Sequence, residues 1–121
     1  MRLFFTLGCL LAALGVGLGA FAAHGLRNVL NAADLATFEV GVRYQMYHAF
    51  ALFAVAWSIE RWGGVTATYA GWAFVAGIVV FSGSLYLLVL TGPRWLGAVT
   101  PLGGVAFLVG WGLLAWTAFR G

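Results

Sequence analysis

The sequence predicts an integral membrane bundle of four α-helices, and three observations lead to this fold class. The chain of 121 residues is 64% hydrophobic and only 7% charged, whereas soluble domains carry roughly 25% charged residues. Its apolar residues form four segments, each long enough to cross a bilayer as a helix. Most connections between these segments are short, which favours an antiparallel arrangement of consecutive helices. We therefore expect an all-α fold, with one transmembrane domain over residues 1–121.

Turn signals and segment lengths set the boundaries of the expected helices. Glu60–Gly64 reads "ERWGG" and Thr91–Trp95 reads "TGPRW", and the glycines in each would end a helix. The first apolar run would measure about 31 Å as a helix, which is a full bilayer crossing. We therefore expect a retained helix there rather than a cleaved secretory signal. The expected spans cover residues of about 3–23, 41–59, 65–90 and 96–119.

The one long connection, residues 24–40, carries a helical pattern of its own. Leu35 and Phe38 recur at helical spacing, and Asp34 is polar. Asn31 stands three residues before Asp34, where a helix N-cap residue would stand. We expect an interfacial amphipathic segment here that runs into the second span.

Small residues form stripes along the expected spans. Such stripes let helix backbones approach closely in a membrane, where no hydrophobic drive brings helices together. Packing within the bundle is one explanation. Contact with a second copy is the alternative for any stripe that faces lipid. The glycines expected to mediate helix packing are Gly8, Gly15, Gly19, Gly77, Gly103 and Gly110.

Hydrogen-bonding side chains gather where the helices would approach the side opposite the termini. Val42–Phe50 reads "VRYQMYHAF" and is far more polar than the apolar run that follows it. Polar groups in lipid are costly and usually face the bundle interior or a cavity. These groups would therefore either bond one another and fix helix register, or line a polar pocket open to that side. The candidate pocket residues are His24, Tyr44, Gln45, His48, Ser82, Ser84, Tyr86 and Thr100.

Several function classes find no support in the sequence. The six basic residues are scattered arginines, so nucleic acid is not an expected partner. No acidic residue lies deep enough to orient a histidine in a hydrolase triad, so we expect no enzyme and no catalytic residue. The single cysteine, Cys9, reads as a packing residue. Only His24 and His48 could ligate a metal or haem, so we expect no metal site and no cofactor.

Three functions remain open at this stage. The first is a non-enzymatic binding or assembly protein whose polar pocket would hold a lipid headgroup, a quinone or a partner helix. The second is a subunit of an oligomeric small-solute transporter or channel, because four helices alone make a poor pathway. The third is a haem- or metal-binding redox protein that uses His24 and His48. The lipid bilayer is a partner in each case, and a homo-oligomer or a larger membrane complex would fit.

Four stretches stand out in order along the chain: "LGAFAAHGL" (Leu18–Leu26), "GVRYQMYHA" (Gly41–Ala49), "FSGSLY" (Phe81–Tyr86) and "TPLGGVAFLVGW" (Thr100–Trp111). They resemble the motifs of the YgdD-like family, small four-helix membrane proteins of unknown function. One departure is Ala22, where relatives carry glycine. The resemblance implies a multi-pass protein of the bacterial inner membrane, with an uncleaved first helix and both termini in the cytoplasm. The charges do not decide the orientation, because three arginines fall on each expected side.

Overall fold

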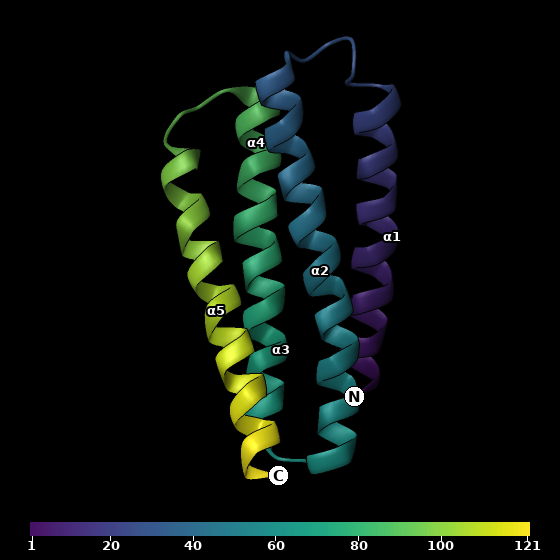
Figure 1. Ribbon diagram of the computed structural model, residues 1–121, viewed down its shortest axis with the longest axis vertical. Coiled ribbons are helices and arrows are strands. Elements are labelled where there is room, and N and C mark those ends of the chain that lie inside the picture. The colour runs from purple at the N-terminus through teal and green to yellow at the C-terminus, as the bar shows by residue number, and fades with distance from the viewer.

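The structure is a computed structural model that describes residues 1–121, and all of its regular structure is helical. Figure 1 shows long rods packed side by side, with both ends of the chain toward the lower end of the bundle, here called the terminal end. The opposite end, which carries the connections at residues 25–31 and 92–95, is called the loop end. The elements are α1 (Arg2–His24), α2 (Ala32–Trp62), α3 (Val65–Gly77), the π-helical segment η1 (Ile78–Ser82), α4 (Gly83–Thr91) and α5 (Leu96–Arg120).

Three rods are long and apolar enough to cross a membrane: α1, the continuous rod Val65–Thr91 and α5. The expected second span is not among them, because polar and charged residues lower the mean hydropathy of α2. The expected span start at residue 41 stays a prediction, and the helix that contains this span begins further upstream. The helix begins at Ala32 and continues for 31 residues, which corresponds to about 46 Å. The amphipathic segment and the second apolar run are therefore one unbroken helix.

The turns between rods follow the residues that predicted them. The side-chain oxygen of Asn31 accepts a hydrogen bond of 2.8 Å from the backbone N–H of Asp34, which confirms the predicted N-cap of α2. Gly63 and Gly64 adopt φ angles of 70° and 82°, and Gly92 ends α4 with φ at 94°. This left-handed region favours glycine, so these positions account for the tight turns before α3 and after α4.

The rods pack unevenly against one another. The main partner of α1 is α2, and the main partners of α5 are α3 and η1, whereas α2 and α5 meet only in part. The largest apolar core lies among the rods and includes Leu52, Val55, Phe74 and Phe107. A smaller cluster near the loop end packs Phe38 against the end of α1. The partial contact between α2 and α5 leaves a lateral opening along one side of the bundle.

The glycines expected to mediate packing lie at contacts within the bundle. A Cβ atom added at Gly103 would lie 2.7 Å from the Cα atom of Phe81, and one at Gly8 would lie 2.9 Å from the backbone oxygen of Ala49. Backbones therefore approach so closely that only glycine fits. Gly15, Gly19, Gly77 and Gly110 face Met46, Val42, Phe107 and Phe74, respectively.

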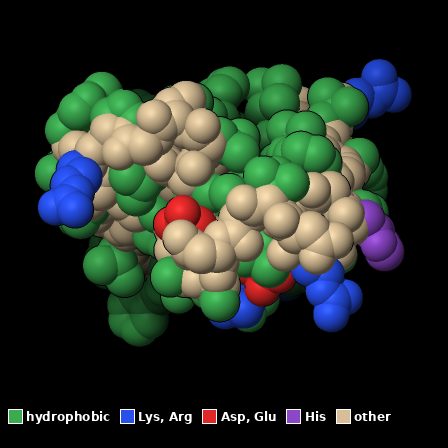
Figure 2. Space-filling view, turned by 90° about the horizontal axis from the view of Figure 1, so that it is seen from above, with side chains coloured by type: hydrophobic (Ala, Val, Ile, Leu, Met, Phe, Trp, Pro, Cys, Tyr) green, Lys and Arg blue, Asp and Glu red, His purple; other side chains and the backbone are tan.

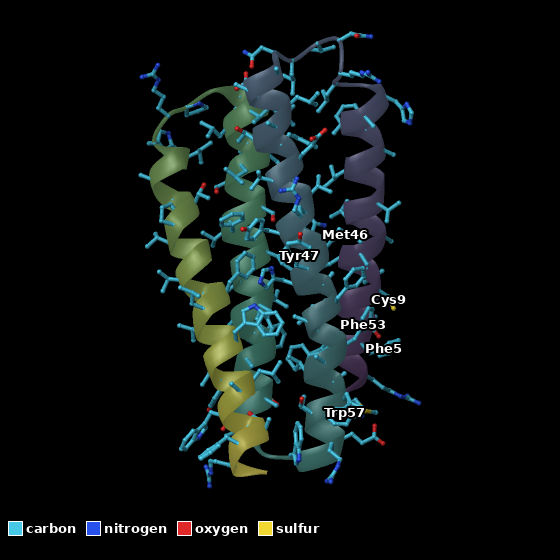
Figure 3. The ribbon with its side chains drawn as sticks, viewed as in Figure 1. Phe5, Cys9, Met46, Tyr47, Phe53 and Trp57 are labelled. Carbon is cyan, nitrogen blue, oxygen red and sulfur yellow. The ribbon has the colours of Figure 1, made fainter.

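Large apolar side chains cover much of the outer surface, as expected for a protein surrounded by lipid. Figure 2 shows the loop end from above, where charged side chains are scattered between apolar ones. Cys9, which the sequence predicted to be a packing residue, is instead exposed on α1. Figure 3 shows its side chain pointing away from the bundle, so that prediction was wrong.

Candidate functional site

A buried amide joins three helices inside the bundle. Gln45 on α2 is 1% exposed, and its Nε2 atom donates a hydrogen bond of 2.9 Å to the backbone oxygen of Leu11 on α1. Its Oε1 atom accepts a hydrogen bond of 2.6 Å from the hydroxyl of Tyr86 on α4. Both ends of the amide are therefore satisfied by the protein. Gln45 holds α1, α2 and α4 in one register.

Hydroxyl groups make similar contacts nearer the loop end. The hydroxyl of Ser82, in η1, donates a hydrogen bond of 2.6 Å to the backbone oxygen of Gly41 on α2. The hydroxyls of Ser84 on α4 and Thr100 on α5 lie 2.5 Å apart. Every buried side-chain polar atom of the structure has a hydrogen-bond partner. This part of the polar cluster therefore bonds to itself, as the register interpretation requires.

His48 connects α2 to α5. Its Nδ1 atom lies 2.7 Å from the backbone oxygen of Tyr44, and its Nε2 atom accepts a hydrogen bond of 3.1 Å from the indole N–H of Trp111. A carbonyl oxygen only accepts and an indole N–H only donates, so these two contacts assign the neutral Nδ1–H tautomer. The imidazole also stacks on Phe107, with ring centroids 3.6 Å apart and planes 7° apart.

The structure does not bring His24 to this cluster. His24 is the last residue of α1 and is exposed, whereas both ring nitrogens of His48 are engaged inside the bundle. The two histidines therefore form no ligand pair. No group of three or more His, Cys, Asp or Glu side chains is placed to hold a metal ion.

The depth of the cluster also differs from the expected layer at one end. Gln45 contacts Leu11, near the middle of α1, and His48 contacts Phe107 and Trp111, near the middle of α5. The polar groups thus extend from the loop end to the centre of the bundle. Gln45 and His48 thus lie nearer the middle of the bundle than the expected layer, several turns into α2, which begins at Ala32.

A lateral groove of about 410 Å³ lies between α2 and α5, and His48 and Trp111 are part of its wall. Tyr44 and Tyr47 are 37% and 53% exposed along it. Among the four tyrosines, only Tyr86 hydrogen-bonds to the protein through its hydroxyl. Figure 3 shows Tyr47 on the side of α2 that faces away from α1. The lining residues are Tyr44, Tyr47, His48, Phe81, Gly104, Phe107, Leu108 and Trp111.

The predicted polar pocket is therefore divided in the structure. Tyr44 and His48 line the α2–α5 groove. Ser84 and Tyr86 instead line a separate, mostly apolar groove of about 550 Å³ between α4 and α5. Gln45 belongs to neither groove and is enclosed between helices. The structure thus distributes these residues over two grooves and an enclosed contact between helices.

The sequence analysis missed the wall that α5 contributes to the groove. Gly104, Phe107, Leu108 and Trp111 follow one another at the spacing of a single helix face. That spacing is the signal that could have identified them. It was overlooked because the prediction considered polar residues near one end, whereas this face is aromatic and lies at mid-height.

Comparisons with known proteins place the chain in a family. A family model described as "Protein of unknown function (DUF423)" matches residues 18–104. The UPF0382 membrane protein YwdK of Bacillus subtilis (strain 168) is 48% identical over 121 residues, which cover 99% of this chain and 98% of that protein. The UPF0382 membrane protein SSP2132 of Staphylococcus saprophyticus is 47% identical over 120 residues, which cover 99% of both chains. No solved structure matches the chain.

The expectation of a membrane-protein family of unknown function is thereby confirmed, while the YgdD-like name stays a prediction. The match over residues 18–104 includes most of the α2–α5 groove and ends at Gly104. The helical structure, its candidate membrane spans and these relatives agree on a multi-pass membrane protein. The chain belongs to the DUF423 family, whose UPF0382 relatives are membrane proteins.

Proposed function

We propose that the protein is a non-enzymatic binding protein of the bacterial inner membrane, whose α2–α5 groove holds a small membrane-soluble molecule. The observation that carries this proposal is a contrast between two parts of the interior. Polar groups such as Gln45 are fully paired with the protein. The α2–α5 groove instead is lined by aromatic residues, among them Tyr44 and Tyr47, whose hydroxyls have no hydrogen-bond partner in the protein. Its volume of about 410 Å³ lies within the range of roughly 300–1,000 Å³ that is typical of small-molecule sites.

The chemistry of the groove supports binding rather than catalysis. General acid–base catalysis needs a titratable group with a free proton site near the substrate. Both ring nitrogens of His48 already have partners in the protein. The three acidic residues, Asp34, Glu39 and Glu60, lie toward the two ends of α2 and not beside His48.

We infer that α2 crosses the membrane together with the three apolar rods, which makes an antiparallel four-helix bundle. Of the residues that lower its hydropathy, the uncharged Gln45, His48 and Ser58 are buried among the other helices, so lipid does not meet them. The first turns of α2 would lie at the interface, with Phe38 packed inward and Asp34 toward water. The bacterial relatives favour the inner (plasma) membrane, and the bilayer is then the main partner.

A pair of glycine substitutions tests the groove. Gly104 lines the groove, and a Cβ atom added there meets nothing within 4 Å, so a leucine side chain would begin in open space and extend into the groove. Gly112 on the same helix has the same open surroundings but lies outside the groove, which makes it a matched control. Each form would be purified in native-lipid nanodiscs, and the bound small molecules identified by mass spectrometry. We expect the wild type and Gly112→Leu to retain the same molecule and Gly104→Leu to lose it. Equal retention by all three forms would rule out the groove.

A further inference from the structure

We propose that the molecule held in the α2–α5 groove is a quinone, a planar conjugated diketone ring with a hydrocarbon tail. This inference rests on the proposed function and names its ligand class. It is carried by the orientation of the aromatic rings, by the two tyrosine hydroxyls and by their depth in the bundle.

Three rings of the groove wall, those of Tyr44, His48 and Phe107, lie nearly parallel to one another, while the other rings of the wall are tilted. The plane of His48 lies 7° from that of Phe107, and the plane of Tyr44 lies 20° from that of His48. Tyr44 and Phe107 lie 27° apart, with ring centroids separated by 6.4 Å. Aromatic rings gain from offset stacking when their faces align. His48 and Phe107 cover one another's faces, so a planar ring would gain by continuing this stack from the groove, whereas a flexible acyl chain gains nothing from that alignment.

The segment η1 supplies a further side of the wall. Its π-helical turn directs Phe81 toward Tyr44, with ring centroids 4.8 Å apart, while the next residue, Ser82, bonds to α2. Single π-helical turns inside α-helices occur frequently at functional sites. Here the turn adds Phe81 to the aromatic wall of the groove without breaking the rod.

The hydroxyls of Tyr44 and Tyr47 are free to donate hydrogen bonds to an acceptor on a ligand. Their rings lie 5.8 Å apart, and neither hydroxyl has a partner in the protein. A polar group left unpaired in hydrocarbon costs free energy, so a ligand that accepts hydrogen bonds is favoured at this position. A quinone carbonyl accepts from a phenol O–H, and an unsubstituted hydrocarbon tail does not.

Depth distinguishes a quinone from a phospholipid. His48, between the two tyrosines and the α5 wall, contacts Phe107 and Trp111 near the middle of α5. The hydrocarbon core is about 30 Å thick, so the ester carbonyls of phospholipids lie about 15 Å from its centre. An uncharged quinone ring can enter the hydrocarbon region and bring its carbonyls to the height of Tyr44 and Tyr47. The lateral groove leaves its tail among the lipid chains.

Photolabelling tests this assignment. The protein in phosphatidylcholine nanodiscs would be labelled with an azido-substituted decylbenzoquinone, and the labelled peptides identified by mass spectrometry. We expect label within Val42–Phe50 and around Trp111, and unlabelled decylubiquinone should displace it. The double variant Tyr44→Phe/Tyr47→Phe keeps both rings but removes both donors. It should need about tenfold more quinone for half-maximal labelling. Tyr69→Phe removes an exposed hydroxyl of α3 outside the groove and should label like the wild type.

The outcomes separate this inference from the proposed function. Labelling lost in Gly104→Leu but unchanged in the double tyrosine variant would mean that the groove binds by shape alone. The quinone assignment would then be overturned and the proposed function kept. Labelling of Gly104→Leu at the wild-type level would overturn both. Loss in Gly104→Leu together with the tenfold weakening in the tyrosine variant supports both.

Discussion

Gln45 is the residue at which three helices of this protein converge. Its amide uses its Nε2 atom on Leu11 and its Oε1 atom on Tyr86, and no other side chain bonds to both α1 and α4. A buried polar group of this kind adds little net stability while it is paired, and is costly when its partner is left alone. Gln45 therefore sets the relative height of the helices more than it adds to the total stability.

A double-mutant cycle tests this role. Gln45→Leu leaves the hydroxyl of Tyr86 unpaired and should lower the free energy of unfolding by about 1–3 kcal/mol. Tyr86→Phe should cost about 1 kcal/mol. The two changes together should cost less than their sum, by about 0.6–1.7 kcal/mol, as hydrogen bonds between membrane helices do. Denaturant unfolding of the four forms in detergent measures this coupling, and strict additivity would contradict it.

The sequence singled out polar residues that bond across helices, but it did not predict the partners of those residues. Gln45, His48 and Tyr86 were identified from their residue types within an apolar segment, and all three bond across helices. His24 was grouped with them wrongly, because a residue at a helix end can turn outward to water, as His24 does. Trp111 was missed, because its amphipathic ring is apolar except for one N–H, and hydropathy does not show the rotation of a helix about its axis.

At the scale of the element, α5 contains glycines of two kinds. A Cβ atom at Gly103 would strike the backbone of Phe81 in η1, which cannot move aside as a flexible side chain can. A Cβ atom at Gly112 would meet open space. The same residue type therefore serves close packing at the first position and leaves an unfilled surface at the second.

The substitution of each glycine by alanine should have effects of opposite sign. Gly103→Ala should lower stability by about 2 kcal/mol or more, through the clash of Cβ with the η1 backbone. Gly112→Ala should raise it by up to about 1 kcal/mol, because alanine favours helix over glycine. Thermal unfolding of both variants in the same detergent provides the comparison. A Gly103→Ala variant as stable as the wild type would show that α5 and η1 are not in close contact.

The ends of the helices were more predictable than their lateral contacts. The turns at Gly63–Gly64 and Gly92 follow from local backbone chemistry, as does the N-cap of Asn31, and these features depend on few residues. The segment η1 has no such local signature in the sequence. It depends on how closely α5 packs against the rod, through the contact of Gly103 with Phe81.

The whole molecule is a bundle with both ends of the chain toward one end (Figure 1). Because α5 is a candidate span, the turn at Gly92 and the C-terminus should lie on opposite sides of the membrane. If α2 also crosses, the two ends of the chain lie on the same side. The even split of arginines gives no orientation, so the compartment of each end must be measured.

Reporter fusions test this topology. A green fluorescent protein joined after residue 121 should fluoresce, because it folds in the cytoplasm. Alkaline phosphatase inserted at residue 92 should be active, because it matures only outside the cytoplasm. The reverse pattern would invert the proposed orientation. The same reporters joined at the N-terminus and after residue 121 should indicate one compartment, and opposite compartments for the two ends would mean that α2 does not cross.

The segment η1 determines how α4 is rotated about the helix axis relative to α3. An α-helix turns by about 100° per residue. The wider π-helical turn takes up one extra residue, so the side chains of α4 point in other directions than they would in an unbroken α-helix of the same residues. Removal of one residue from Ile78–Ser82 would keep the rod helical and nearly as long. It would also leave Tyr86 pointing at Gln45 and Ser84 pointing at Thr100, whereas the same residues wound as an unbroken α-helix would rotate both away. The rotation of α3 about its axis thus suits packing against α5, and the rotation of α4 suits its hydrogen bonds to Gln45 and Thr100.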